Sequence, residues 1–297
     1  MENTASGMAS DSDTPKKRLI TRRRALGVLF GGAGVGTACA ADAFLLGPKW
    51  LDVTRKEVVC PGLGGSLDGL RVGVISDIHY KPDQDKDLLV QAVDTLLAEK
   101  PDLITIVGDY IDRSPKVVEP MLRQLSRLEA PHGVFACLGN HDGWADQSGF
   151  ISRSFQQHGI EFLINQHSRL QIRGESLALA ATDHVWLGDP DPQRALRGIP
   201  QHVPILAMVH EPDFFDEMTT HRRIALQVSG HTHGGQCQVP VVGYAPARVA
   251  YGEKYLEGVY DRGDSRLFVT RGLGTVGLRV RFACRPEVAI LTLQAEA

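Results

Sequence analysis

The chain has 297 residues and a formal net charge of −3 at pH 7; 43% of its residues are hydrophobic and 23% are charged. These values are typical of a globular protein with one large domain or two small ones. The slight net negative charge excludes a nucleic-acid surface held by bulk positive charge, so we expect no nucleic-acid binding from charge. A phosphate-bearing partner would need local cations or a metal.

Residues 1–46 differ from the rest of the chain. Six Lys and Arg residues occur before position 25, and a Gly- and Ala-rich apolar stretch without Lys or Arg follows. The stretch TRRRAL at 21–26 resembles a twin-arginine signal, which implies the twin-arginine export machinery as a partner. ACA at 38–40 offers a small-residue cleavage site. We therefore expect a twin-arginine-like signal or an N-terminal anchor, and an exported protein that is periplasmic or membrane-associated. The alternatives are a retained anchor at the cytoplasmic face of the membrane and a plain N-terminal tail.

The remaining chain alternates apolar runs with helical patterns. Residues 47–70 are expected to be a linker and first strand, and residues 71–297 one domain. Strands are predicted over 70–76, 102–108, 133–139, near 161–181, over 204–210, over 223–230 and within 255–293. Helices are predicted over 86–100 and 115–128. Strands that are almost continuously hydrophobic are covered on both faces, which predicts an α/β sandwich.

Candidate metal ligands follow five of these predicted strands. They are Asp77 and His79, Asp109, Asn140, His210, and the pair His231 and His233. One Asp or His after a strand is a common turn or cap residue. Five such endings are hard to attribute to turns, and strand ends in α/β sheets meet in a crevice. Oxygen and imidazole ligands without cysteine suit Mn, Fe or Zn, and seven candidates are too many for one ion.

The motifs D-x-H, G-D, G-N-H-D, H and G-H-x-H occur in order over about residues 71–235. This series closely resembles the calcineurin-like metallophosphoesterase superfamily. The flanking stretches SDIHY, GDYID, HEPDFF and SGHTHGGQ resemble its bacterial exported or membrane-associated phosphodiesterase branch, which includes UDP-2,3-diacylglucosamine pyrophosphatases. The resemblance implies a four-layer αββα sandwich with a dinuclear metal site at the carboxyl ends of the strands.

The resemblance also implies a role for each motif residue. It divides the candidate ligands between two divalent ions: Asp77, His79 and His233 for the first, Asn140, His210 and His231 for the second, and Asp109 for both. His141 would be the catalytic imidazole beside the leaving group. The ions would be Mn, Fe or Zn, because the same ligands serve all three.

Other residues are weaker candidates. Asp112 and Asp142 are expected either to orient imidazoles by accepting their second N–H or to be solvated turn carboxylates. His184 and Trp186 lie in a loop-like stretch that can roof a site, and a half-buried loop Trp is the alternative. Arg271, with Arg279 and Arg281, is expected to meet a second phosphate or simply to lie on an exposed strand face.

We expect the protein to hydrolyse a phosphodiester or pyrophosphate bond through a hydroxide activated by two metals, on a small-molecule, nucleotide or lipid-linked substrate. The alternatives are a phosphomonoesterase or protein phosphatase, and a noncatalytic scaffold. Purple acid phosphatases have a Tyr three residues after the second-motif Asp, where this chain has Asp112. A tyrosinate-bound ferric ion is therefore not expected. The sequence indicates no oligomeric state.

Overall fold

A computed structural model describes residues 33–146, 149–241, 245 and 248–296 of the protein. The chain divides into two compact units, residues 1–40 and 41–297. The described part of the first unit, residues 33–40, is helical. The twin-arginine-like stretch at 21–26 lies outside the described residues. No helix in the described ranges is both long and apolar enough to span a membrane.

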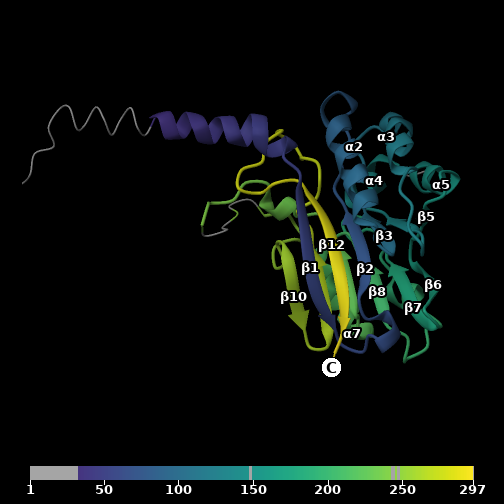
Figure 1. The fold of residues 1–297 in the computed structure, drawn as a ribbon. Coiled ribbons are helices and arrows are strands. Elements are labelled where there is room, and N and C mark those ends of the chain that lie inside the picture. Colours follow the sequence, from purple (N-terminus) through teal and green to yellow (C-terminus); the bar gives the residue numbers. More distant parts are fainter. Residues whose placement is uncertain (1–32, 147–148, 242–244, 246–247, 297) are drawn as a thin grey trace, which may run out of the picture. The chain divides into compact units, whose positions relative to one another are not determined.

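Two six-stranded sheets form the second unit (Figure 1). The strands of the first sheet, in spatial order, are β1 (Asp52–Cys60), β12 (Glu287–Ala295), β2 (Leu70–Ile75), β3 (Leu103–Val107), β4 (Val134–Cys137) and β5 (Glu161–Phe162). Those of the second are β10 (Gly258–Arg262), β11 (Ser265–Val269), β9 (Leu226–Ser229), β8 (Ile205–Met208), β7 (Glu175–Ala181) and β6 (Gln166–Ile172).

Both sheets are mixed. In the first sheet β2 to β5 run parallel, whereas β12 pairs antiparallel with β2 and parallel with β1. In the second, β7, β8, β9 and β11 run parallel, with β6 and β10 antiparallel at the two edges. Parallel strands place their carboxyl ends at one edge of a sheet, so the loops after β2, β3, β4, β8 and β9 can converge.

Helices cover the outer face of each sheet. The first sheet is covered by α2 (Pro82–Glu99), α3 (Val118–Leu125) and α5 (Phe150–Gln157). The second is covered by α6 (Pro192–Leu196) and α7 (Phe215–His221). The short α4 (Asn140–Ala145) follows β4 directly. The expected four-layer αββα sandwich is therefore confirmed.

The side chains of a strand alternate between two hydrophobic cores, one between the two sheets and one between a sheet and its helices. In β2, Leu70, Val72 and Val74 face the core between the sheets, whereas Ile75 packs with the helices. Successive side chains of a strand point to opposite faces, so a continuously apolar strand suits a sheet that is covered on both sides.

The predicted elements differ from the structure mainly at their ends. The helix expected over 86–100 begins at Pro82, which occupies the first turn, where a missing N–H costs nothing. The helix expected over 115–128 starts as a 3-10 turn over Pro115–Val117 and continues as α3, which ends at Leu125.

Candidate metal centre

The seven candidate ligands lie on loops at the carboxyl ends of strands from both sheets. Asp77 and His79 follow β2, Asp109 follows β3, Asn140 begins α4, His210 follows β8, and His231 and His233 follow β9. The two histidines of the last pair flank Thr232, and His233 opens the 3-10 turn η6 (His233–Gly235). The structure thus brings together residues that are up to 156 positions apart in the chain.

Five of these seven residues have a left-handed backbone. The φ angles are 52° at Asp77, 42° at His79, 54° at Asp109, 72° at His231 and 51° at His233. Few non-glycine residues adopt positive φ, because the Cβ atom then crowds the backbone. Such conformations cost about 1–3 kcal/mol each and cluster at functional sites. The surrounding fold therefore holds these residues in place against a local backbone preference.

Two glycines allow the loops to approach the carboxylates closely. A Cβ atom on Gly230 would lie 2.2 Å from Oδ2 of Asp77, and one on Gly139 would lie 2.3 Å from Oδ1 of Asp109. Real Cβ atoms do not come this close to another heavy atom. The glycines in the motifs G-N-H-D and G-H-x-H are thus required for the two buried carboxylates to fit.

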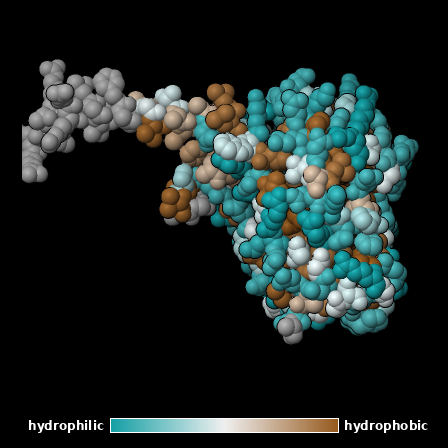
Figure 2. All heavy atoms as spheres, viewed as in Figure 1, coloured by the Kyte–Doolittle hydropathy of each residue, from teal (hydrophilic) through white to brown (hydrophobic). Residues whose placement is uncertain are grey.

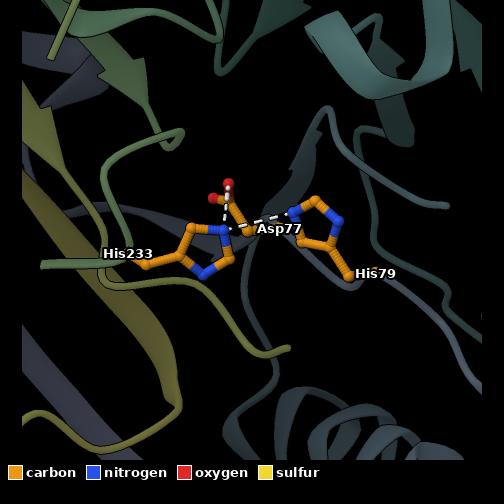
Figure 3. A group of neighbouring side chains, drawn as sticks. All are labelled: Asp77, His79 and His233. Carbon is orange, nitrogen blue, oxygen red and sulfur yellow. Dashed lines mark hydrogen bonds and ion pairs between the residues drawn. The ribbon is translucent and has the colours of Figure 1, made fainter. Parts of the chain in front are cut away.

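Asp77, His79 and His233 form the first group of ligand atoms (Figure 3). Nε2 of His233 lies 3.4 Å from Oδ1 of Asp77 and 3.1 Å from Nε2 of His79. The two imidazoles and the carboxylate point toward one another, and all three residues are buried. Two nitrogens directed at each other beside a carboxylate are the donor set that a divalent transition ion accepts.

Asp109 joins this group to a second one. Its Oδ2 atom lies 3.4 Å from Nε2 of His79 and 3.1 Å from Nε2 of His210. His231 donates from Nε2 to the Ala250 carbonyl at 2.8 Å, which leaves its Nδ1 for a ligand. One ligand atom from each of Asp109, His210 and His231 lies within 4.8 Å of the others. Asp109 is therefore shared between two overlapping groups.

The buried Oδ1 atom of Asn140, at the centre, has no hydrogen-bond partner among the described residues. His210 donates from Nδ1 to the Val107 carbonyl at 2.7 Å and directs Nε2 toward Oδ2 of Asp109, 3.1 Å away. An unpaired buried acceptor costs about 1–3 kcal/mol. Both atoms are of the kind that binds a cation, and the residues present therefore fit divalent metal ions.

The electrostatics of the cluster also favour bound cations. Burial alone would lower the pKa of His79, but hydrogen bonds to Asp109 and Asp112 outweigh it and raise the pKa to about 9. Burial opposes ionisation of Asp109, yet His210 and His79 hold its pKa well below the usual value. The carboxylates therefore create a negative potential that positive charge must neutralise.

Asp112 lies where an imidazole-orienting carboxylate is expected. Its Oδ1 atom is 2.6 Å from Nδ1 of His79, and its Oδ2 atom is 3.0 Å from Nζ of Lys81. Although burial opposes ionisation, these two contacts lower the pKa of Asp112 to about 2. An ionised Asp112 fixes the N–H of His79 on Nδ1 and leaves Nε2 facing the cluster.

Asp142 has different partners from those expected. Its carboxylate accepts N–H groups from Tyr110, Ile111 and Gly139, at 2.9, 3.3 and 3.0 Å, so it holds two backbone segments rather than an imidazole. These bonds connect the loop after β3 to the start of α4. Burial and the nearby Asp109 raise the pKa of Asp142 to about 8.

His141 lies at the edge of the cluster. It is half-buried, and its ring centroid is 4.8 Å from that of His79. Its Nδ1 atom lies 3.3 Å from the Asp112 carbonyl, and its backbone N–H donates to Oδ1 of Asp109. Burial lowers the pKa of His141. This imidazole lines both a hollow of about 200 Å³ over the cluster and a neighbouring hollow of about 480 Å³.

One tryptophan lines the site, and a second packs against it. Trp186 lines the hollow over the cluster, and its ring centroid is 6.2 Å from that of His231. Trp144 was not singled out in the sequence, but its ring lies 5.0 Å from both His141 and Trp186, and its indole N–H donates to the Trp186 carbonyl. The position of Trp144, one turn after His141 at the start of α4, was the only sequence signal for it. His184 is buried and packs against Gly143.

The three arginines are engaged in structural contacts. Arg271 pairs with Asp52 and Glu287, each at 2.9 Å, beside a hollow that no candidate metal ligand lines. Arg281 is wholly buried and donates to the carbonyls of Arg271, Gly272, Gly274 and Cys284. Arg279 donates to the Gln84 carbonyl. Their surroundings do not support the expected contact with a second phosphate, because backbone carbonyls and carboxylates already occupy the guanidinium groups.

Tyr110 is not placed to bind a metal. Its hydroxyl lies 2.6 Å from the Cys137 carbonyl and 2.9 Å from the Ile106 carbonyl, and burial raises its pKa well above the usual value.

The comparisons with known proteins agree with this fold and site. A family model described as calcineurin-like phosphoesterase matches residues 70–235. The chain therefore belongs to the calcineurin-like phosphoesterase family, and it is a phosphoric ester hydrolase with residues for divalent metal.

Two curated relatives extend over nearly the whole chain. The chain is 31% identical over 287 residues to the uncharacterized metallophosphoesterase YkuE of Bacillus subtilis, with 93% of this chain and 98% of the relative covered. It is 30% identical over 286 residues to the phosphodiesterase YaeI of Escherichia coli, with 93% and 100% covered. Among solved structures, the NAD nucleotidase NadN of Haemophilus influenzae has a TM-score of 0.48 at 14% identity, over 69% of this chain and 45% of that one.

Proposed function

We propose that the protein hydrolyses a phosphodiester or pyrophosphate bond at two divalent cations. The first would be held by Asp77, His79 and His233, the second by Asn140, His210 and His231, and both by Asp109. The observation that carries this proposal is the position of Asp109, whose Oδ2 atom lies within 3.4 Å of imidazole nitrogens from both groups. A carboxylate between two cations offsets their mutual repulsion.

The ions and the protein residues would contribute different parts of the hydrolysis at such a site. Two bound cations supply an activated water and neutralise charge on the phosphoryl oxygens. The protein supplies the position of Asp109 and the imidazole of His141. Because Nδ1 of His141 faces the Asp112 carbonyl, Nε2 is free to take up a proton and deliver it to the leaving oxygen.

The surroundings of His141 support a substrate with a group on each side of the phosphate. The hollow of about 480 Å³ beside His141 is lined by Lys81, Arg113 and Ser114, among others, and can receive a leaving group. Guanidinium and ammonium groups bind phosphate oxygens or a second phosphate. The name of the relative YaeI, a phosphodiesterase, also favours a diester.

The test is hydrolysis by the full-length chain loaded with Mn, Fe or Zn. The substrates are bis-p-nitrophenyl phosphate, p-nitrophenyl phosphate and UDP-2,3-diacylglucosamine. The variants are His141→Ala and Asp109→Asn, with His221→Ala as the matched control, because His221 lies on α7 next to Glu217. We expect metal-dependent hydrolysis of the diester or pyrophosphate that falls at least about 100-fold in the first two variants and is unchanged in the control.

Other outcomes separate the alternatives. A preference for p-nitrophenyl phosphate would show a phosphomonoesterase instead. No turnover of any substrate despite two bound ions would favour a noncatalytic scaffold. Equal losses in His221→Ala would mean that the assay reports folding rather than catalysis.

We also propose that residues 1–46 direct export or anchor the domain at the membrane. Support comes from the TRRRAL stretch at 21–26 and from the division of the chain after residue 40, directly after ACA at 38–40. Replacing Arg22 and Arg23 by Lys is expected to leave the chain in the cytoplasm, as measured by fractionation. Unchanged fractionation of this variant would contradict twin-arginine export.

A further inference from the structure

An exposed apolar rim lies next to the candidate metal centre. It consists of eight exposed large hydrophobic residues on three segments: Phe44, Leu45, Leu46, Trp50, Val239, Val241, Val276 and Leu278. The segments are residues 42–50, which include η1 (Asp42–Leu46) and η2 (Gly47–Lys49), and the loops 236–241 and 274–285. Figure 2 shows hydrophobic residues in brown at this end of the second unit.

Hydrogen bonds hold the three segments together. The Arg281 N–H donates to the Ala43 carbonyl at 2.9 Å, which ties segment 42–50 to loop 274–285. Gln238 and Phe282 pair through the backbone, which ties loop 236–241 to the same loop. The three segments therefore lie next to one another at one end of the second unit.

The rim continues directly into the catalytic cleft. The side chain of Gln236 accepts the Val276 N–H at 2.7 Å, and Val276 and Gln236 both line the hollow over the metal cluster. Val276 also lines the larger hollow beside His141. A surface that covered the rim would thus lie at the entrance to the site.

The charges around the rim favour an anionic partner. Segments 42–50, 236–241 and 274–285 contain one acidic residue, Asp42, and two exposed basic ones, Lys49 and Arg285; Arg281 is wholly buried, and Arg279 pairs with Asp85. Lys49 and Arg285 are exposed, and the guanidinium carbon of Arg285 lies 3.7 Å from the centroid of the Trp50 ring. An exposed Trp with basic residues beside aliphatic side chains is typical of a surface that contacts the interface of an anionic membrane.

The backbone conformation of Val241 also favours contact with a membrane. Its backbone has a φ of 75° and its side chain is fully exposed. A β-branched residue is strongly disfavoured at positive φ. Because the side chain of Val241 is exposed, no hydrophobic burial offsets the free-energy cost of this conformation. Insertion into a lipid interface would bury this side chain.

From these observations we propose that the apolar rim docks onto a lipid bilayer with anionic headgroups and places the metal centre at the bilayer surface. Phe44, Leu45 and Leu46 also belong to residues 1–46, the proposed export or anchor segment, whereas the other five rim residues lie outside it. The proposal concerns binding and does not depend on the bond that the enzyme cleaves.

Hydrogen–deuterium exchange of the full-length protein tests the proposal directly. The amides of Val239, Val241 and residues 276–278 are expected to exchange more slowly with vesicles of phosphatidylcholine and phosphatidylglycerol than with phosphatidylcholine alone. The proposal is overturned if these loops exchange at the same rate with and without anionic vesicles, even when the chain sediments with them. It is also overturned if raising the protein concentration without vesicles protects the loops equally, because the partner would then be a second copy.

A pair of variants tests the contribution of the rim. The partition of the full-length double variant Val241→Asp, Leu278→Asp into anionic vesicles is expected to be at least about tenfold weaker than that of the wild type. Val59→Asp is the control, because Val59 is also an exposed hydrophobic residue (45%) but lies at the opposite end of β1 from segment 42–50. All variants should hydrolyse soluble bis-p-nitrophenyl phosphate at the wild-type rate. Equal partition of the double variant and Val59→Asp would contradict docking by the rim.

Discussion

The carboxylate of Asp112 lies 2.6 Å from Nδ1 of His79, on the opposite side of the imidazole from the candidate metal cluster. This contact fixes which nitrogen of His79 faces a cation, and Lys81 holds the second oxygen of the same carboxylate. Because Asp112 follows β3 of the first sheet, the sheet sets the position of this carboxylate. The carboxylate in turn orients the imidazole of His79 at the centre of the site.

Replacing Asp112 by Asn should therefore weaken metal binding without removing a ligand. We expect Mn affinity and kcat/KM to fall about 10- to 100-fold, because the amide no longer holds the His79 N–H as strongly. Asp87→Asn, at an exposed position of α2, is the control. Unchanged Mn affinity in Asp112→Asn, measured by calorimetric titration, would remove Asp112 from the metal centre.

Gly230 allows a second test. A Cβ atom there would lie 2.1 Å from Oγ of Ser76 and 2.2 Å from Oδ2 of Asp77. Gly230→Ala is therefore expected to displace Asp77 and to lower both Mn content and kcat/KM at least about tenfold. Gly65→Ala, where the added methyl meets open space, should retain both. Full Mn content and activity in Gly230→Ala would show that the loop can move without harm to the site.

Arg281 is expected to stabilise the fold rather than bind substrate. Its buried guanidinium donates to carbonyls of the loop that packs on Asp77, and Lys cannot reach these acceptors in the same geometry. Arg281→Lys should lower the free energy of unfolding by about 3 kcal/mol. Arg123→Lys, at an exposed position of α3, should change it by less than about 0.5 kcal/mol. Urea denaturation measures both, and equal stability of the two variants would contradict this role.

The iron-loaded protein should lack a visible charge-transfer band from tyrosinate. The hydroxyl of Tyr110 faces two backbone carbonyls, and its raised pKa keeps it protonated at neutral pH. An absorption spectrum of the iron-loaded wild type is the measurement. A band that disappears in Tyr110→Phe would show that this arrangement changes when iron binds.

The parts predicted from sequence are those with a strong local signal. The apolar runs at 70–76 and 204–210 have continuous hydrophobicity, and each is followed by candidate ligands, so both the strands and the position of the metal centre could be inferred. Edge strands have a weaker signal. β1 carries Arg55, Lys56 and Glu57 on an exposed stretch and was expected only as part of a linker with a first strand.

The remaining features depend on contacts between distant residues. The partners of Arg271 include Asp52, 219 positions earlier in the chain, and no local pattern indicates that pair. Asp142 is expected to orient an imidazole or to be a solvated turn carboxylate, but at the start of α4 its carboxylate accepts backbone N–H groups of Tyr110 and Gly139 instead. The left-handed backbone at Asp77 and His231 is likewise set by packing, since neither residue type requires it.

The central claim is that Asp109 is shared by two cations, and metal stoichiometry tests it most directly. Elemental analysis of the Mn-loaded, full-length protein should find about two ions per chain in the wild type and in His221→Ala, and at most one in Asp109→Asn, because loss of the shared carboxylate charge leaves two cations in mutual repulsion. At most one ion in the wild type, or two retained in Asp109→Asn, would contradict the account.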